Sequence, residues 1–263
     1  MTPEEVVKTH TILRCVVGSK LYGTDNAESD TDQMGVCVEP LEVAQGFTEF
    51  EQYIKQDRDD TGRMVTECKT YGLKKFLRLA LGGNPDVTPM FFVPVEFHTV
   101  SVATGRQMQE LSSHVISKKS GVKFLGYMES QRQRLLGERG QKNVSRPLLV
   151  EKYGYDTKYA MQILRLGMQG LELLCTGRIT FPMAEPDREF LKDVREGRLD
   201  INDVLNRAGN LKKMIEGAIE DCPLPDEPDT ALVEDWMVNT YYRTWRADRF
   251  MSDHEDLISK VPH

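Results

Sequence analysis

The first hundred residues alternate short apolar runs with turn-rich stretches. Residues 12–17 (ILRCVV), 34–38 (MGVCV) and 65–71 have the length and apolar content of buried strands. Residues 73–81 (LKKFLRLAL) carry apolar side chains at helical spacing, and the glycines at 82 and 83 end that helix. The pattern predicts a β-turn-β core with helices packed on it.

Beyond residue 100 almost every apolar pattern has helical spacing. Helices are predicted at residues 121–137, 158–175, 188–195, 201–220 and 231–250, with a proline-rich break at 222–229. The predicted fold class is therefore α+β: a small mixed β-sheet with helices on one side over residues 1–100, then a mainly helical domain over residues 101–263. The functional site is expected in the cleft between them.

Composition favours a soluble globular protein. The 263 residues are 40% hydrophobic and 29% charged, with a mean hydropathy of -0.45. No apolar run approaches the roughly 18 residues of a membrane span, and the first 15 residues lack the pattern of a secretion signal. The five cysteines form no C-x-x-C pair. We therefore expect reduced thiols, no membrane partner and a cytoplasmic location.

The charge is unevenly distributed. The net charge is -7, but residues 118–165 hold eleven Lys or Arg against four Asp or Glu, an excess of +7 that leaves the rest of the chain at -14. A basic middle segment suits a polyanion such as RNA, although the solvated face of a helix gives the same count.

The most informative motif lies between the first two predicted strands. It reads Gly18-Ser19, then eleven residues later Asp30-x-Asp32, then an apolar strand. If both aspartates lie on one strand, their spacing of two residues makes their side chains face the same side of the sheet. Carboxylate oxygens are the hard ligands that Mg²⁺ prefers. Two such ions can activate an attacking hydroxyl and stabilise a leaving pyrophosphate, with Mn²⁺ as a substitute.

The Gly-Ser pair suits the other half of that chemistry. Glycine lets the backbone approach a polyphosphate closely, the Ser19 hydroxyl and backbone N–H groups can donate to it, and Lys20 adds charge. Tyr22 could stack on a base, or it could simply pack beside the turn. A loop rich in Ser, Asp and Gly also occurs in surface turns without any function.

With these motifs the chain resembles the DNA polymerase beta-like nucleotidyltransferases, and more narrowly their RNA repair pathway branch. The blocks GSKLYGTDNAESDTDQMGV, YGLKKFLRLALGGNP, KYGYDTKYAMQILRLGMQGLELLCTGRITFP and DVREGRLD carry the resemblance. It implies that Gly18 and Ser19 bind phosphate and that Asp30 and Asp32 bind the metal. It also places a third carboxylate at Glu67, with Glu39 and Glu51 as alternatives.

The chain departs from that branch at several positions. Pro89 stands where the family usually has an acid, and Tyr159 and Gln162 stand where histidines are common. These departures fit a divergent branch, either bacterial or viral, the latter acting in host cytoplasm. They leave the predicted metal site intact but weaken any inference about substrate.

Two basic residues in the helical half are further candidates. Lys158 and Arg165 are two helical turns apart, so we expect them to share one face that meets a triphosphate or RNA, unless that face is merely solvated. Asp156 lies in the same block, and Arg195 is a weaker candidate of the same kind.

Three functional hypotheses follow. The first is a Mg²⁺-dependent nucleotidyltransferase that moves an NMP from an NTP to an RNA 3′ end, tRNA-like for example, and releases pyrophosphate. The second keeps the chemistry but uses a protein Ser, Thr or Tyr hydroxyl as acceptor. The third is a non-catalytic module that binds NTP or RNA, against which the intact Gly18, Ser19, Asp30 and Asp32 argue.

Overall fold

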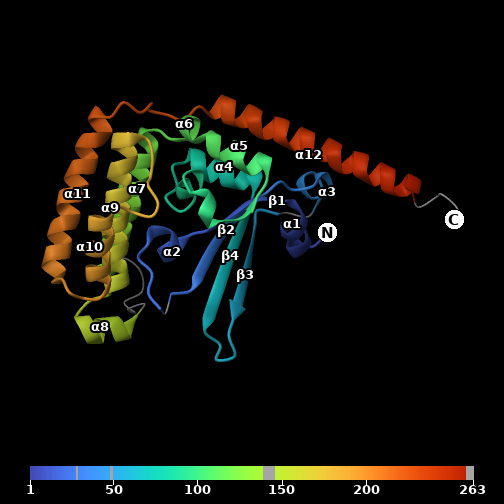
Figure 1. Ribbon diagram of the computed structural model, residues 1–263. Coiled ribbons are helices and arrows are strands. Elements are labelled where there is room, and N and C mark those ends of the chain that lie inside the picture. Colours follow the sequence, from blue (N-terminus) through green and yellow to red (C-terminus); the bar gives the residue numbers. More distant parts are fainter. Residues whose placement is uncertain (28, 48–49, 139–145, 259–263) are drawn as a thin grey trace.

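A five-stranded mixed sheet forms the centre of the N-terminal half (Figure 1). The structure is a computed structural model and describes residues 1–27, 29–47, 50–138 and 146–258. The strands are β1 (Thr11–Val16), β2 (Thr31–Cys37), β3 (Gln52–Arg58), β4 (Met64–Gly72) and β5 (His98–Ser101). The mixed sheet and the surrounding helices confirm the predicted α+β class.

The sheet order is β3-β4-β2-β1-β5, and β2 and β4 form its parallel pair. Asp32 lies directly opposite Glu67 in that pair. Residues in register on neighbouring strands share a face of the sheet. The two acids are therefore held side by side by backbone hydrogen bonding, and Gln56 of β3 stands next to Glu67 in the same row.

Helices occupy most of the remaining chain. The helices that precede β5 in the sequence are α1 (Pro3–His10), α2 (Gly18–Tyr22), α3 (Leu41–Ala44) and α4 (Leu73–Leu81), followed by two short 3₁₀ helices, η1 (Thr88–Phe91) and η2 (Val95–Phe97). After it come α5 (Ala103–Glu110), α6 (Ser112–Val115), α7 (Lys118–Leu135), α8 (Pro147–Tyr153), α9 (Thr157–Thr176), α10 (Glu185–Arg195), α11 (Ile201–Asp221) and α12 (Thr230–Ile258). Over the described ranges, none of these helices has the combination of length and hydropathy that a membrane span requires.

Helix α9 is the centre of the helical half and packs against α7, α10 and α11. Its small residues allow close contact: a Cβ on Gly170 would lie 2.8 Å from Cβ of Phe124 on α7. The predicted apolar face of this helix is buried, including Ile163 and Leu164. The helical periodicity read from the sequence thus identified the main packing element correctly.

The predicted arrangement of helices on one side of the sheet is incomplete. The face with Leu13, Val36 and Tyr71 packs into the main core, but α1 lies against the opposite face, where Val6 meets Cys37. The sequence Thr2-Pro3-Glu4-Glu5 forms a capping box that starts α1. The first helix therefore had a local signal that the apolar pattern alone did not reveal.

One hydrophobic cluster contains residues from both halves of the chain, from Ile12 to Val233. Helix α5 packs on β1, and Tyr22 and Arg165 are in contact across the predicted boundary near residue 100. The division into residues 1–100 and 101–263 stays a prediction.

Helix α12 runs from the helical half past α6, α5 and α4 and extends beyond the sheet (Figure 1). It is fastened to the sheet through Glu39, a buried carboxylate just after β2. Glu39 Oε2 accepts from the Tyr241 hydroxyl at 2.6 Å and from the Leu73 backbone N–H at 3.1 Å, and its carbonyl accepts from Trp245 Nε1 at 2.9 Å. Burial raises the pKa of Glu39.

We expect the substitution Tyr241→Phe to lower the free energy of unfolding by about 1–3 kcal/mol, because a buried carboxylate loses a hydrogen-bond donor. Tyr242→Phe is the matched control, since Tyr242 is 65% exposed and should change stability by less than about 0.5 kcal/mol. Urea unfolding at pH 7 measures both. Equal losses in the two variants would show that the Glu39 contact does not fasten α12.

Candidate active site

The Asp-x-Asp motif lies at the beginning of β2. Asp32 is in the strand, and Asp30 directly precedes it. Glu67 stands beside Asp32 on β4, and its Oε2 accepts a hydrogen bond from Gln56 Nε2 at 2.5 Å. The structure therefore brings all three predicted acids to one end of the parallel pair.

The three carboxylates repel one another. The pKa of Asp32 is raised, first by burial and then by the negative charges of Asp30 and Glu67. Lys158 and Lys20 act in the opposite direction but do not cancel the effect. A site with this imbalance favours the arrival of a cation.

The Gly18 turn touches Asp32 directly. The Val17 N–H donates to the Asp32 carbonyl at 2.9 Å, and Gly18 has a φ of +67°. A Cβ on Gly18 would lie 2.3 Å from Asp32 Oδ2, so only glycine fits here. Lys20 Nζ donates to Thr31 Oγ1 at 2.5 Å, which holds this lysine over the start of β2. The predicted phosphate turn and the predicted metal ligands are thus neighbours.

A group of cations faces these acids from the helical half. Asp156 is the N-cap of α9 and accepts from the backbone N–H of Lys158 at 3.0 Å, while Arg146 pairs with its carboxylate at 3.2 Å. The pKa of Lys158 is lowered, first because neighbouring atoms partly desolvate its ammonium group and then by the charges of Arg146 and Arg195, whereas Asp30 and Asp156 raise it. These neighbouring positive charges favour the binding of an anion.

Arg195, at the end of α10, is hydrogen-bonded to the loop that joins the Gly18 turn to Asp30. Its Nη1 donates to the Thr24 carbonyl at 2.7 Å and its Nη2 to Ser29 Oγ at 3.3 Å. From sequence alone Arg195 was only a weaker candidate and Arg146 was not singled out, because both reach the site through contacts distant along the chain. For Asp156, the N-cap position before an apolar helix was a usable signal.

Lys158 and Arg165 lie two turns apart on α9, but they do not form one basic surface, and their contact with a triphosphate or RNA stays a prediction. Lys158 is exposed, but Arg165 is only 6% exposed and donates to Gln169 and Gln162. Its guanidinium lies 4.4 Å from the centre of the Tyr22 ring, which packs at 5.9 Å from Phe181. Arg165 therefore holds α2 against α9, and stacking of Tyr22 on a base stays a prediction.

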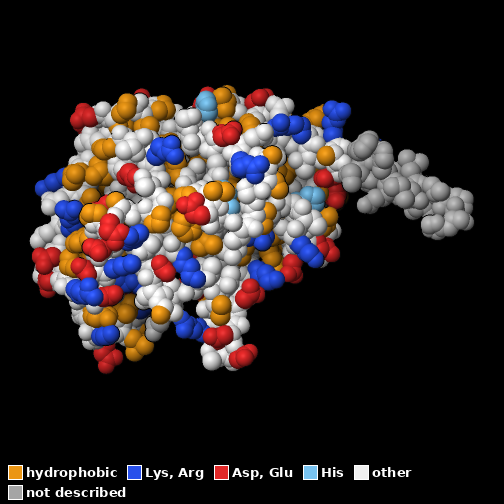
Figure 2. All heavy atoms as spheres, viewed as in Figure 1, with side chains coloured by type: hydrophobic (Ala, Val, Ile, Leu, Met, Phe, Trp, Pro, Cys, Tyr) orange, Lys and Arg blue, Asp and Glu red, His pale blue; other side chains and the backbone are white. Residues whose placement is uncertain are grey.

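The basic segment at 118–165 does not form one surface. Lys118 and Lys119 pair with Asp226 and Glu227, and Arg132 pairs with Glu129. Figure 2 shows basic and acidic side chains interspersed over the helical half. Residues 139 and 142 of this segment lie outside the described residues. Of the segment's described basic residues, Lys158 acts on Asp30 and Asp32, and Arg146 lies next to Lys158 through its ion pair with Asp156.

The alternatives for the third carboxylate lie elsewhere. Glu39 follows the far end of β2 and fastens α12, and Glu51 pairs with Lys75 and Arg78 on α4. Of the three candidates, Glu67 is the one whose charge acts on Asp32.

The donor chemistry at this end of the sheet suits Mg²⁺, because Asp30, Asp32 and Glu67 offer hard oxygens that lack full charge compensation. Among the residues that the structure describes, however, no three Asp, Glu, His or Cys side chains converge at metal-binding distance. A metal centre with these three ligands therefore stays a prediction.

Comparison with known proteins identifies the family. No curated protein matches the chain. A solved nucleotidyltransferase-like protein from Exiguobacterium sibiricum is 11% identical, with 82% of this chain and 71% of that chain covered and a TM-score of 0.31. A family model for the RNA repair pathway DNA polymerase beta family matches residues 2–236, which include every site residue described above. The chain is therefore a nucleotidyltransferase and belongs to the RNA repair pathway DNA polymerase beta family.

Proposed function

We propose that this protein transfers an NMP from a Mg²⁺-bound NTP to the 3′ hydroxyl of an RNA and releases pyrophosphate. The observation that carries the proposal is the pairing of Asp32 with Glu67 across β2 and β4, with Gly18 in contact with Asp32. The family membership supports nucleotidyl transfer as the reaction.

The charges of the site support a metal-bound triphosphate as the ligand. Carboxylates crowd around Asp32, and cations crowd around Lys158 next to them. A divalent cation would relieve the first group, and the phosphates of an NTP would relieve the second. One ligand with both charges thus satisfies both halves of the site.

Each group in the site then has a task. Asp30, Asp32 and Glu67 would hold Mg²⁺, which supplies charge neutralisation and lowers the pKa of the acceptor hydroxyl. The Gly18 turn and Ser19 would bind the triphosphate, and Lys20, Arg146 and Lys158 would offset its charge. The acceptor hydroxyl would lose its proton to solvent, and its oxygen would form a bond to the α-phosphorus while the bond from that phosphorus to the bridging oxygen breaks, so pyrophosphate leaves.

RNA is the acceptor that the family favours, since its description places it in RNA repair. A protein hydroxyl would use the same chemistry. The test is to incubate the protein with labelled NTPs, Mg²⁺, total RNA and cell protein, and to separate RNA from protein on gels. We expect label in RNA, and none with the Asp30→Ala/Asp32→Ala variant. Label in protein alone would show that the acceptor is a protein hydroxyl and not RNA. Equal labelling by the Asp30→Ala/Asp32→Ala variant would overturn the assigned site.

We expect Arg195→Met to lower kcat about 100-fold, because the loop between Gly18 and Asp30 loses two hydrogen bonds that position it. Arg198→Met is the matched control, since Arg198 is 63% exposed and pairs with Asp193 and Glu196. Steady-state kinetics beside urea unfolding measures both effects. If kcat falls only as much as stability predicts, or falls equally in the control, Arg195 has no positioning role.

A further inference from the structure

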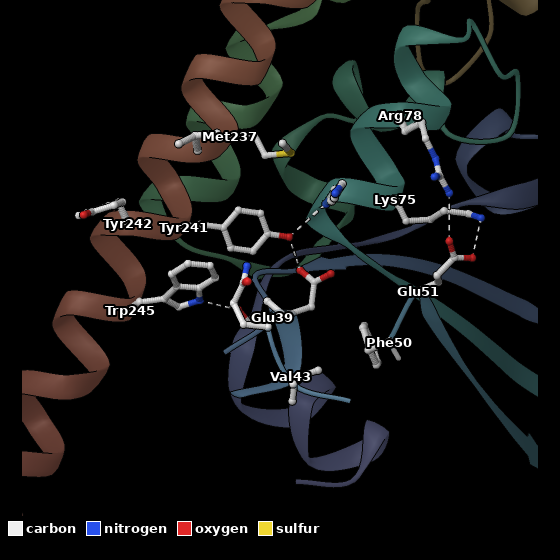
Figure 3. Close-up of a pocket in the computed structure, with 15 residues that line it drawn as sticks. Glu39, Val43, Phe50, Glu51, Lys75, Arg78, Met237, Tyr241, Tyr242 and Trp245 are labelled. Atoms are coloured by element: carbon white, nitrogen blue, oxygen red, sulfur yellow. Dashed lines mark hydrogen bonds and ion pairs between the residues drawn. The ribbon is translucent and has the colours of Figure 1, made fainter. Parts of the chain in front are cut away.

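A cavity lies at the opposite end of β2 and β4 from Asp32 and Glu67. Its volume is about 670 Å³, which is within the usual range for small-molecule sites. Figure 3 shows Tyr241 and Trp245 reaching in from α12, with Phe50 and the group of Glu51, Lys75 and Arg78 on the other side. The chemistry assigned to the active site does not use this cavity.

The aromatic wall of the cavity is held in place. The Tyr241 and Trp245 rings are 5.2 Å apart, and both are fixed by hydrogen bonds to Glu39. Their polar atoms are thereby occupied, so the rings offer apolar surface to a ligand. A planar ring is the group that such a wall binds best.

Helix α4 supplies positive charge to the cavity. Three cations, from Lys74, Lys75 and Arg78, line the cavity with two carboxylates, from Glu39 and Glu51. Glu51 is engaged by Lys75 and Arg78, and Glu39 by Tyr241 and the Leu73 N–H. The exposed Lys74 ammonium has no hydrogen bond or ion pair within the described part of the chain. The charge of Lys74 acts on Glu39, but the three cations outnumber the two carboxylates, so the lining of the cavity carries a net positive charge.

Part of this cavity comes from outside the family match. The match ends at residue 236, whereas the α12 side chains that line the cavity run from Met237 to Trp245. We propose that the cavity binds a nucleotide, with its base against Tyr241 and Trp245 and its phosphate at Lys74. The nucleotide could come as a free molecule or as one unit of an RNA strand, and both share this chemistry.

The fluorescence of Trp245 reports on this site. The substitution Trp236→Phe leaves Trp245 as the one tryptophan of the sequence. With EDTA present, we expect AMP or a ten-nucleotide oligoadenylate to change its emission saturably, and Lys74→Gln to weaken binding about tenfold. Lys213→Gln is the matched control, because it removes one exposed positive charge from α11, a helix that contributes no residue to the lining of the cavity.

The Asp30→Ala/Asp32→Ala variant separates this proposal from the proposed reaction, since it should bind the probes as the unsubstituted protein does. Tighter binding of the oligoadenylate supports an RNA strand as the source, and equal binding supports a free nucleotide. No saturable change with either probe would overturn the proposal. Equal binding by Lys74→Gln and Lys213→Gln would also overturn it, with thermal unfolding used to confirm that both variants fold.

Discussion

Replacement of Asp32 by Asn is expected to lower nucleotidyl transfer about 10³-fold or more. The amide keeps the shape of the side chain but removes the negative charge that the proposed Mg²⁺ site requires, and a bound metal contributes several kcal/mol to the transition state. Asp57→Asn is the matched control, because Asp57 is exposed on β3 and is in register with Thr66, so it faces the other side of the sheet. Initial rates of label transfer measure both variants.

The same substitution should stabilise the fold. Because the folded-state pKa of Asp32 is raised, its ionised form costs folding free energy. We expect Asp32→Asn and the unsubstituted protein to be equally stable below the unfolded-state pKa of about 3.9. The advantage of the variant should grow as the pH rises and level off above the folded-state pKa. Loss of both activity and stability would instead indicate a structural role for Asp32.

Gly18→Ala is expected to reduce both activity and stability. The left-handed backbone costs any residue with a Cβ about 1–2 kcal/mol, and here the new Cβ would overlap Asp32 Oδ2. Displacement of a reacting carboxylate by about 1 Å can lower a rate 100-fold, so we expect a loss of at least that size.

Gly62→Ala separates the two causes. Gly62 has a φ of +81°, but nothing lies within 4 Å of its Cβ position. This variant should lose similar backbone stability and keep its activity. Urea unfolding and initial rates measure both variants. If Gly18→Ala retains activity, the contact between the Gly18 turn and Asp32 does not serve the reaction.

The fold was predictable where local pattern and burial agree. The helix at 73–81 and the long helix after Asp156 were found with nearly correct ends, because apolar spacing and glycine stops coincide. Strand β3 was missed because it is an edge strand with mostly exposed, polar residues. Strand β2 begins earlier than its apolar run, since Thr31 and Asp32 are held by pairing with β4.

Site residues that are close together in the sequence were predictable, but contacts between distant parts of the chain were not. The motif spacing indicated Asp30 and Asp32, and the family resemblance indicated Glu67, which stands beside Asp32 in the structure. Their role as metal ligands stays a prediction. Helical spacing gave the relative directions of Lys158 and Arg165 but could not tell that Tyr22 covers the second. The partners of Lys118 and Lys119 lie more than a hundred residues away, so a count of charges could not reveal that they are paired.

The most direct test of the proposed function uses one synthetic RNA sequence prepared in two forms, one with a 3′ hydroxyl and one with a 3′-deoxy end. The RNA is incubated with the protein, Mg²⁺ and all four NTPs, and its mass is measured before and after. We predict that RNA with a 3′ hydroxyl gains the mass of at least one nucleotide, and that the same RNA with a 3′-deoxy end gains none. Equal gain by both RNAs, or no gain by either, would contradict transfer to an RNA 3′ hydroxyl.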